Sequence, residues 1–134
     1  MPDPPRRATK LPLYSPWLGD EEIDAAADTL RSGWLGMGTR VAELEERFAS
    51  LVGSDHAVAL NSCTAALHLA LVASGVGPGS TVLTTPYTFT ASAEAALRTG
   101  AAVKFVDINP ETLNVEPDAM AAAVTPDVAA LLPV

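Results

Sequence analysis

The fold is indicated most directly by residues 56–85, HAVALNSCTAALHLALVASGVGPGSTVLTT. Its first five residues form a short apolar run typical of a buried strand, and residues 64–73 have the composition of a helix. A cluster of glycine, proline and serine then leads into a second apolar run at residues 81–85, which also predicts a strand. Strands that are apolar nearly throughout belong to parallel sheets covered on both faces, so this stretch indicates an α/β fold.

The same alternation continues to the last residue. The further predicted elements are a helix over 90–98 closed by Gly100, a strand over 102–106, a short helix over 117–124 opened by Pro117, and a strand over 128–134. We therefore expect a mostly parallel sheet with flanking helices. An exposed sheet edge with the sequence VAALLPV would favour aggregation, so we expect this sequence to be part of a longer protein.

Two amphipathic helices are predicted upstream of this alternation. Residues 20–31 predict a helix capped by Asp20, with acidic residues in its first turn and an apolar stripe that contains Ile23 and Leu30. Residues 39–52 predict a second helix, capped by Thr39. Residues 1–12 are rich in proline and charge and predict a flexible N-terminal arm, which leaves residues 13–134 as the folded part.

Composition excludes several classes of function. The 134 residues include 16 acidic and 8 basic side chains, for a net charge of −8. This balance argues against binding to nucleic acid or to an anionic membrane. A single cysteine excludes a disulfide framework, and two histidines without helical i, i+4 spacing predict no metal site. Neither a membrane span nor a secretory signal is visible, so we expect a cytoplasmic protein.

Residues 61–65 (NSCTA) lie between a predicted strand and a predicted helix. Ligands gather at the carboxyl ends of strands in such sheets, and a helix N-terminus offers free amides to a phosphate. Cys63 is small enough to let a ligand approach the backbone, and Thr64 adds a hydroxyl donor. Plain helix capping by Ser62 or Thr64 explains the same residues, and the pattern alone leaves both interpretations open. Nothing in the sequence pairs with Cys63 as a catalytic nucleophile.

Residues 85–90 (TPYTFT) occupy the equivalent position after the next strand. Their aromatic side chains suit stacking on a planar ring, although the pattern alone favours a core plug under the loop. Asp107, at the end of another strand, favours a turn over a ligand contact. The glycine-rich residues 32–38 are either a mobile substrate loop or a connector between helices. Motifs for dinucleotides, ATP and α/β-hydrolase chemistry are absent from the sequence.

Taken together, these segments resemble one known family. The matching segments are SGWL with Gly38 (residues 32–38), LEERF (44–48), NSCTAALHLA (61–70), TPYTF (85–89) and GAAVKFVDI (100–108). Their order is similar to that of the DegT/DnrJ/EryC1/StrS family of pyridoxal-phosphate-dependent sugar aminotransferases. The resemblance covers residues 11–134, nearly all of the chain.

The resemblance implies a fold, a cofactor and a reaction. The fold is part of the large domain of an aspartate-aminotransferase-like, fold type I enzyme. The reaction moves an amino group, usually from glutamate, to a keto group on a nucleotide-linked sugar, and related members make aminohydroxybenzoate. Cys63 and Thr64 match positions that bind the phosphate of pyridoxal phosphate, and Phe89 matches the residue that stacks on its ring. Trp34 matches a loop near the active-site entrance, which implies a substrate contact.

The resemblance also has a gap. The family's Schiff-base lysine, and the acid that pairs with the pyridine nitrogen, have no counterpart here. Lys10 and Lys104 are the only lysines, and neither matches the family's catalytic position. We therefore expect residues 13–134 to be an incomplete cofactor-binding domain that stops before the catalytic lysine and is inactive alone, with no catalytic residue of its own. The alternative is a non-catalytic cofactor-binding or subunit-interaction protein; the complete enzyme is expected to be a homodimer.

Overall fold

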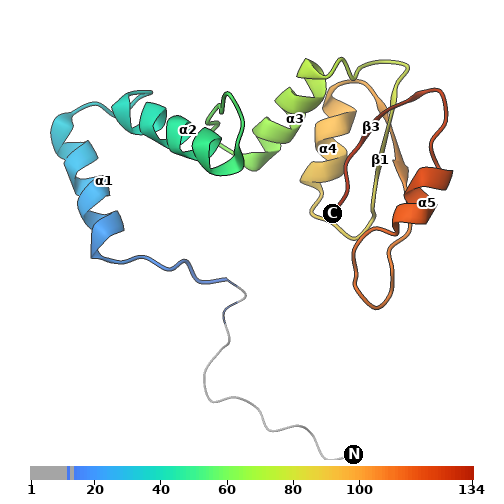
Figure 1. Cartoon of the computed structure of the whole chain (residues 1–134), viewed down its shortest axis with the longest axis horizontal. Coiled ribbons are helices and arrows are strands. Elements are labelled where there is room, and N and C mark those ends of the chain that lie inside the picture. The colour runs from blue at the N-terminus through green and yellow to red at the C-terminus, as the bar shows by residue number, and fades with distance from the viewer. Residues whose placement is uncertain (1–11, 13) are drawn as a thin grey trace, which may run out of the picture. The chain divides into compact units, whose positions relative to one another are not determined.

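The computed structural model describes residues 12 and 14–134 (Figure 1). Apart from Pro12, the predicted N-terminal arm lies outside the described residues. The chain divides into two compact units, one that ends at Val58 and one that runs from Ala59 to Val134. We call them unit 1 and unit 2 and describe each by itself.

Unit 1 contains two helices, α1 (Asp20–Ser32) and α2 (Thr39–Val52). The predicted caps Asp20 and Thr39 are wrong, because the cap positions are the preceding glycines. At the start of α1 the Glu22 carboxylate accepts a hydrogen bond of 2.7 Å from the Gly19 amide, so this side chain takes over one terminal donor. Asp20 instead lies within the acidic first turn, where the helix dipole favours it.

The apolar stripes of unit 1 are exposed. On α1, Ile23 and Leu30 keep 59% and 67% of their surface, and none of the helix residues is buried. On α2, Ala49 is the one residue of the helix that is buried. Within the described residues, unit 1 therefore has amphipathic helices of the predicted kind but hardly any core of its own.

Unit 2 is built on a three-stranded sheet. Its strands are β1 (Thr81–Thr84), β2 (Ala102–Phe105) and β3 (Val128–Leu131), in the order β2-β1-β3. Both pairings are parallel, as predicted. All four residues of the central strand β1 are buried. The predicted parallel α/β architecture is therefore confirmed.

Helices cover both faces of this sheet. They are α3 (Cys63–Ala73), α4 (Ala91–Arg98) and α5 (Pro117–Ala122). On one face, Leu71 of α3 and two alanines of α4 pack with Val82 in a core cluster. On the other face, Met120 of α5 packs against Leu83 and Val106. Successive residues of β1 thus point to opposite cores, which explains why this strand is apolar without alternation.

The prediction of a strand over residues 56–60 is wrong. The segment has no strand assignment and does not belong to the three-stranded sheet. A strand needs a hydrogen-bonded neighbour, and residues 56–60 pair with none of the three strands of the sheet. Strand β3 is also shorter than predicted: it ends at Leu131, two residues before Pro133, which has no amide hydrogen to donate.

Within residues 12 and 14–134, no helix is both long enough and apolar enough to cross a membrane.

Candidate functional site

The N-terminus of α3 leaves two amides free for a ligand. Ser62 caps the helix, and its Oγ accepts a hydrogen bond of 3.2 Å from the Ala65 amide. The Ser62 carbonyl accepts the Ala66 amide at 3.1 Å. The amides of Cys63 and Thr64, the first two residues of the helix, have no acceptor of this kind among the described residues. Capping and phosphate binding are therefore compatible, because the cap uses a different amide from the two that remain.

The side chains at this helix start suit an anion. Cys63 is exposed and unpaired as a thiol, so only a small group stands between solvent and the backbone. Thr64 is half-buried and carries a hydroxyl donor at the same helix start. The positive end of the helix dipole adds to the attraction. These donors fit a phosphate group, with two amides and one hydroxyl available to its oxygens.

The loop between β1 and α4 presents its aromatic side chains to solvent. Phe89 keeps 78% of its surface exposed and Tyr87 keeps 59%. The interpretation of these residues as a core plug, favoured by the pattern alone, is therefore wrong. The smaller residues of the loop fill the interior instead, because Thr85 is fully buried. An exposed ring at Phe89 is free to stack on a planar ligand.

Hydrogen bonds within the loop hold this conformation. The Thr85 Oγ accepts the Tyr87 amide at 3.3 Å, and the hydroxyls of Thr88 and Ser92 lie 2.8 Å apart. Sequence reasoning missed Ser92, although the spacing of Thr88 and Ser92 across the start of a helix was a usable signal. Ser92 is buried at the start of α4 and so anchors the segment that carries Phe89.

Topology brings the predicted cofactor residues to one side of unit 2. Helix α4 follows the carboxyl end of β1, and α3 ends before the turn that enters β1 at its amino end. The two helices pack against each other, and in Figure 1 each of them begins at its own lower end. Cys63, Thr64 and the loop with Phe89 therefore share the edge where parallel strands end, the usual ligand position in open α/β sheets.

Lys104 and Asp107 do not join this arrangement. The Lys104 ammonium donates to the carbonyl of Ala123, at the end of α5, over 3.5 Å. The Asp107 Oδ1 accepts the amide of Ile108 at 2.8 Å, whereas the turn in this segment is held by Asn109, whose Oδ1 accepts the amides of Glu111 and Thr112. Lys104 thus contacts the α5 side of the sheet, away from the start of α3.

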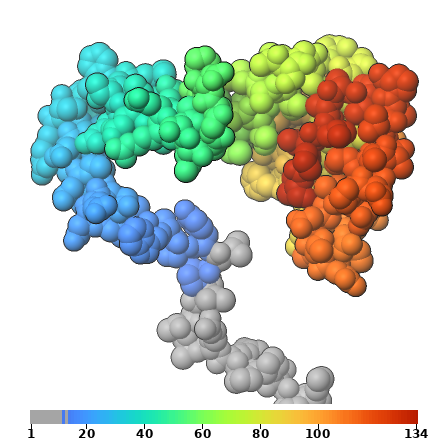
Figure 2. Space-filling model, viewed as in Figure 1, coloured from blue at the N-terminus to red at the C-terminus, as the bar shows by residue number. Residues whose placement is uncertain are grey.

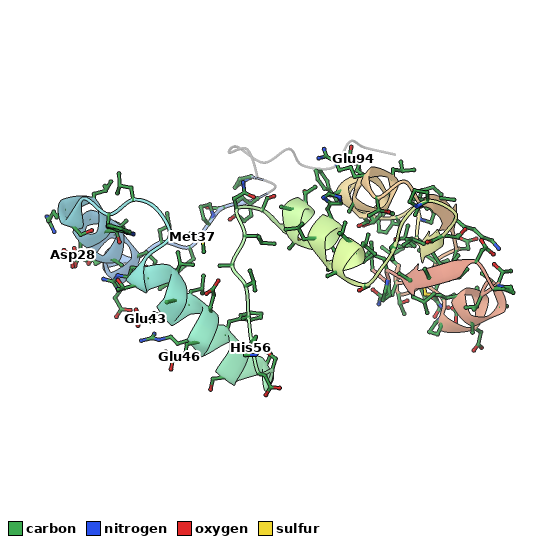
Figure 3. All side chains as sticks on the ribbon, turned by 90° about the horizontal axis from the view of Figure 1, so that it is seen from above. Asp28, Met37, Glu43, Glu46, His56 and Glu94 are labelled. Carbon is green, nitrogen blue, oxygen red and sulfur yellow. The ribbon has the colours of Figure 1, made fainter. Side chains whose placement is uncertain are left out.

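Trp34 lies in unit 1, in the loop between α1 and α2. Its Nε1 donates a hydrogen bond of 2.8 Å to the carbonyl of Met37, while 67% of the residue stays exposed. A pocket of about 250 Å³ next to it is lined by residues of both helices, among them Asp28 and Arg40. Figure 3 shows Asp28 on α1 and Met37 in the connecting loop. The loop has hydrogen bonds of its own and carries an exposed indole.

Comparison with known proteins identifies the class. The profile of the DegT/DnrJ/EryC1/StrS aminotransferase family matches residues 16–134. The chain belongs to this family, as the resemblance of its motifs predicts, and the family and its solved members depend on pyridoxal phosphate.

Individual relatives support this assignment. The spore coat polysaccharide biosynthesis protein SpsC of Bacillus subtilis is 51% identical over 124 residues, which are 92% of this chain and 32% of SpsC. Spr1654 of Streptococcus pneumoniae, described as a sugar aminotransferase and solved in its pyridoxamine-phosphate form, has a TM-score of 0.86 and 36% identity. That match covers 93% of this chain and 32% of Spr1654.

A third similar structure is that of 3-amino-5-hydroxybenzoic acid synthase, with a TM-score of 0.83 and 39% identity over 95% of this chain and 33% of the synthase. These proteins confirm the predicted fold type I architecture. The chain spans about a third of the length of the relatives it matches.

Proposed function

We propose that this chain forms the cofactor-phosphate-binding part of a cytoplasmic aminotransferase that converts a nucleotide-linked keto sugar into an amino sugar, with glutamate as the donor. The observation that carries the proposal is the start of α3, where the free amides of Cys63 and Thr64 stand beside the Thr64 hydroxyl. Membership of a sugar aminotransferase family supports this interpretation. The role of SpsC in polysaccharide biosynthesis, together with 51% identity, supports a sugar as the substrate.

Each residue of the site has a distinct role in this proposal. Cys63 and Thr64 hold the phosphate and so fix one end of pyridoxal phosphate. Phe89 stacks on its ring and fixes the plane of the ring. When bound, the cofactor supplies an electron sink for the transfer of an amino group. Trp34 contributes to a substrate site, for which its exposed indole is suited.

We also propose that the chain alone does not catalyse transamination. The chemistry needs a lysine amine at the cofactor to form the covalent link and to shuttle a proton. Lys104 is tied to a backbone carbonyl at the end of α5, and Lys10 matches no family motif. In the complete enzyme we propose a homodimer. The competing hypothesis is that the protein binds the cofactor but catalyses no reaction.

Binding of two amine-form ligands tests the site without interference from lysine chemistry. We expect pyridoxamine 5′-phosphate to bind at least about tenfold more tightly than pyridoxamine, because charge-assisted hydrogen bonds to the phosphate are each worth about 1.5–3 kcal/mol. Thr64→Val should weaken binding of the phosphorylated ligand only, whereas Phe89→Ala should weaken both. Equal affinities of the two ligands for the unaltered chain, measured by equilibrium dialysis, would refute the phosphate site.

Borohydride trapping separates the two functions. After reduction of a mixture with pyridoxal phosphate and peptide mapping by mass spectrometry, we expect no stoichiometric adduct on Lys10 or Lys104. A stoichiometric adduct that Lys104→Ala removes would show that this chain carries its own reactive lysine. Tight phosphate-dependent binding in a complete protein that still lacks transamination would favour the non-catalytic function.

A further inference from the structure

The loop between β1 and α4 exposes a ring that has little protein around it. Phe89 keeps 78% of its surface exposed, so contacts with other side chains do little to set where its ring points. The rotamers open to an aromatic side chain depend on the φ and ψ angles of its own backbone. The direction of the Phe89 ring therefore depends on whatever holds the backbone at this residue. In Figure 2 the gold atoms of the α4 region, next to this loop in the chain, reach the surface of unit 2.

Ser92, the second residue of α4, is hydrogen-bonded on both sides of the Phe89 Cα atom. Its Oγ lies 2.8 Å from the Oγ of Thr88, the residue before Phe89. Its amide donates to the carbonyl of Phe89 over 3.1 Å. One residue thus holds the side chain of position 88 and the carbonyl of position 89, and the φ and ψ bonds of Phe89 lie between these two contacts.

Ser92 belongs to the packed part of unit 2. It is 7% exposed, and Ala95 and Ala96, one turn further along the same helix, are fully buried in the core cluster that contains Val82 of β1. The two hydrogen bonds of Ser92 therefore connect an exposed loop to an element that packs on the sheet. Because the Ser92 hydroxyl is buried, losing its partner would leave a polar group unpaired, which favours the bonded conformation of the loop.

The contact between two hydroxyls distinguishes Ser92 from other hydroxyl residues on the helices. Thr29 in α1 and Ser74 at the end of α3 each donate to the carbonyl four residues earlier, over 2.9 and 2.8 Å. Such hydrogen bonds stay within one helix. The Oγ of Ser92 instead contacts a side chain four residues earlier that lies outside the helix, so this contact ties the loop to α4.

We propose that Ser92 is a positioning residue for Phe89, which holds the loop backbone so that the ring is oriented before a ligand arrives. Ser92 makes no contact with the ligand in this proposal and acts only through Phe89. A ring that is already oriented loses less conformational freedom on binding, so the affinity for a planar ligand rises. The proposal rests on the proposed function in taking the pyridine ring of the cofactor as that ligand.

Backbone dynamics of the ligand-free chain test the positioning itself. Relaxation of ¹⁵N gives the order parameter of the Phe89 amide, which we expect near the value of about 0.85 that is typical of rigid backbone. Ser92→Ala and Thr88→Val should each lower it below about 0.6, whereas Thr88→Ser keeps the hydroxyl and should keep the order parameter. Thr99→Ala is the matched control, because it removes a hydrogen bond of 2.7 Å to the Ala96 carbonyl at the other end of α4.

Affinity for pyridoxamine 5′-phosphate, measured by equilibrium dialysis of the full chain, tests the consequence for binding. Ser92→Ala should weaken binding about two- to tenfold, the range expected when one more side chain must be ordered on binding. In a Phe89→Ala background the same substitution should weaken binding no further, because Ser92 acts through the ring. A substitution that only destabilised the fold would weaken binding equally in both backgrounds. Thermal unfolding of each variant checks its fold.

Several results would overturn the proposal. They are an unchanged order parameter of Phe89 in Ser92→Ala, a Thr88→Ser variant that behaves like Thr88→Val, and an effect of Ser92→Ala on affinity that is absent or is equally large without the Phe89 ring. If Phe89→Ala itself leaves the affinity unchanged, the proposed stacking role of Phe89 is wrong, whereas a lowered order parameter in Ser92→Ala still shows that Ser92 positions the loop. The two failures are therefore distinguishable.

Discussion

Asp127 shows how single side chains secure the turn that enters β3. The hydroxyl of Thr125 donates to its Oδ1 over 2.6 Å, and that of Thr81, at the start of β1, donates to its Oδ2 over 2.5 Å. These hydrogen bonds lower the pKa of Asp127 below its ordinary value of 3.8, with a smaller contribution from the Lys104 charge. Sequence reasoning did not identify this contact, because 46 residues separate Thr81 from Asp127.

The lowered pKa predicts an acid-dependent loss of stability. The folded chain binds fewer protons at Asp127 than the unfolded chain, so the stabilisation is complete above pH 3.8 and is lost as the pH falls through the lower folded-state pKa. We expect Asp127→Asn to lower the melting temperature at neutral pH and to make the acid side of the profile less steep. Thermal unfolding measured from about pH 2 to about pH 7, a span that brackets the pKa values of carboxyl groups, tests both expectations. Parallel profiles of the two proteins would contradict the prediction.

Gly38 gives a second prediction at this scale. Its backbone is extended, so an alanine meets no conformational strain, but its Cβ would lie 2.5 Å from Cδ1 of Trp34. We expect Gly38→Ala to displace the indole and to break the hydrogen bond from Nε1 to Met37. A shift of Trp34 fluorescence, recorded in a Trp17→Phe background, reports this displacement.

Gly36 in the same loop serves as the control for Gly38. A Cβ at Gly36 would have no heavy atom within 4 Å, so Gly36→Ala should leave the Trp34 emission unchanged. An identical spectral shift for both variants would show that the loop as a whole has moved and that the contact between Gly38 and Trp34 is not responsible.

At the scale of elements, the cap of α3 stabilises the helix that carries the cofactor residues. Ser62→Ala removes the hydrogen bond to the Ala65 amide and should lower stability by about 1 kcal/mol. Denaturant unfolding followed by circular dichroism measures the change. Ser50→Ala, on the exposed side of α2, is the matched control and should change stability by less than about 0.5 kcal/mol. A neutral Ser62→Ala would mean that the cap does not limit the stability of α3.

The elements also show what sequence reasoning can and cannot reach. Helix ends were predicted well where glycine adopts the left-handed conformation, as at Gly53 with φ of 71°. The predicted caps Asp20 and Thr39 lie one residue after the observed cap positions, Gly19 and Gly38. Neither glycine has a capping side chain, and at Gly19 the Glu22 side chain accepts the backbone amide instead. The prediction of a strand over residues 56–60 was wrong because the pairing of a strand depends on segments that are distant in the sequence.

The candidate site follows the same division. The pattern placed Cys63 and Thr64 at a helix start, and α3 does begin at Cys63, whereas the strand predicted before it is absent. The pattern alone favoured burial of the aromatic side chains in the loop, whereas Phe89 is exposed. A short loop has no regular hydrophobic periodicity, so its sequence does not reveal which side chains fill the interior. The family resemblance, which depends on the order of several motifs, assigned Phe89 to the cofactor, and that role stays a prediction.

For the whole molecule, the distribution of buried residues predicts unequal local stability. Unit 2 holds two core clusters, one on each face of its sheet, and β1 is buried throughout. In the described part of unit 1, α1 has no buried residue and α2 has only Ala49. Local opening costs little where few apolar contacts are lost.

Hydrogen exchange should therefore separate the two units. We expect amides in the middle of α1 and α2 to exchange at least about a hundredfold faster than those of β1, equivalent to a difference in opening free energy of about 2.7 kcal/mol. Nuclear magnetic resonance of the whole chain at neutral pH gives the rates, and the amide of Val82 is the internal reference because its side chain is fully buried. If α2 were as protected as β1, its exposed apolar stripe would have to be covered in solution, and light scattering on the same sample would show whether a second copy covers it. Equal protection of α2 and β1 in a monomer would instead mean that α1 and α2 are more stable than their single buried residue allows. In that case local stability could not be inferred from buried surface for this chain.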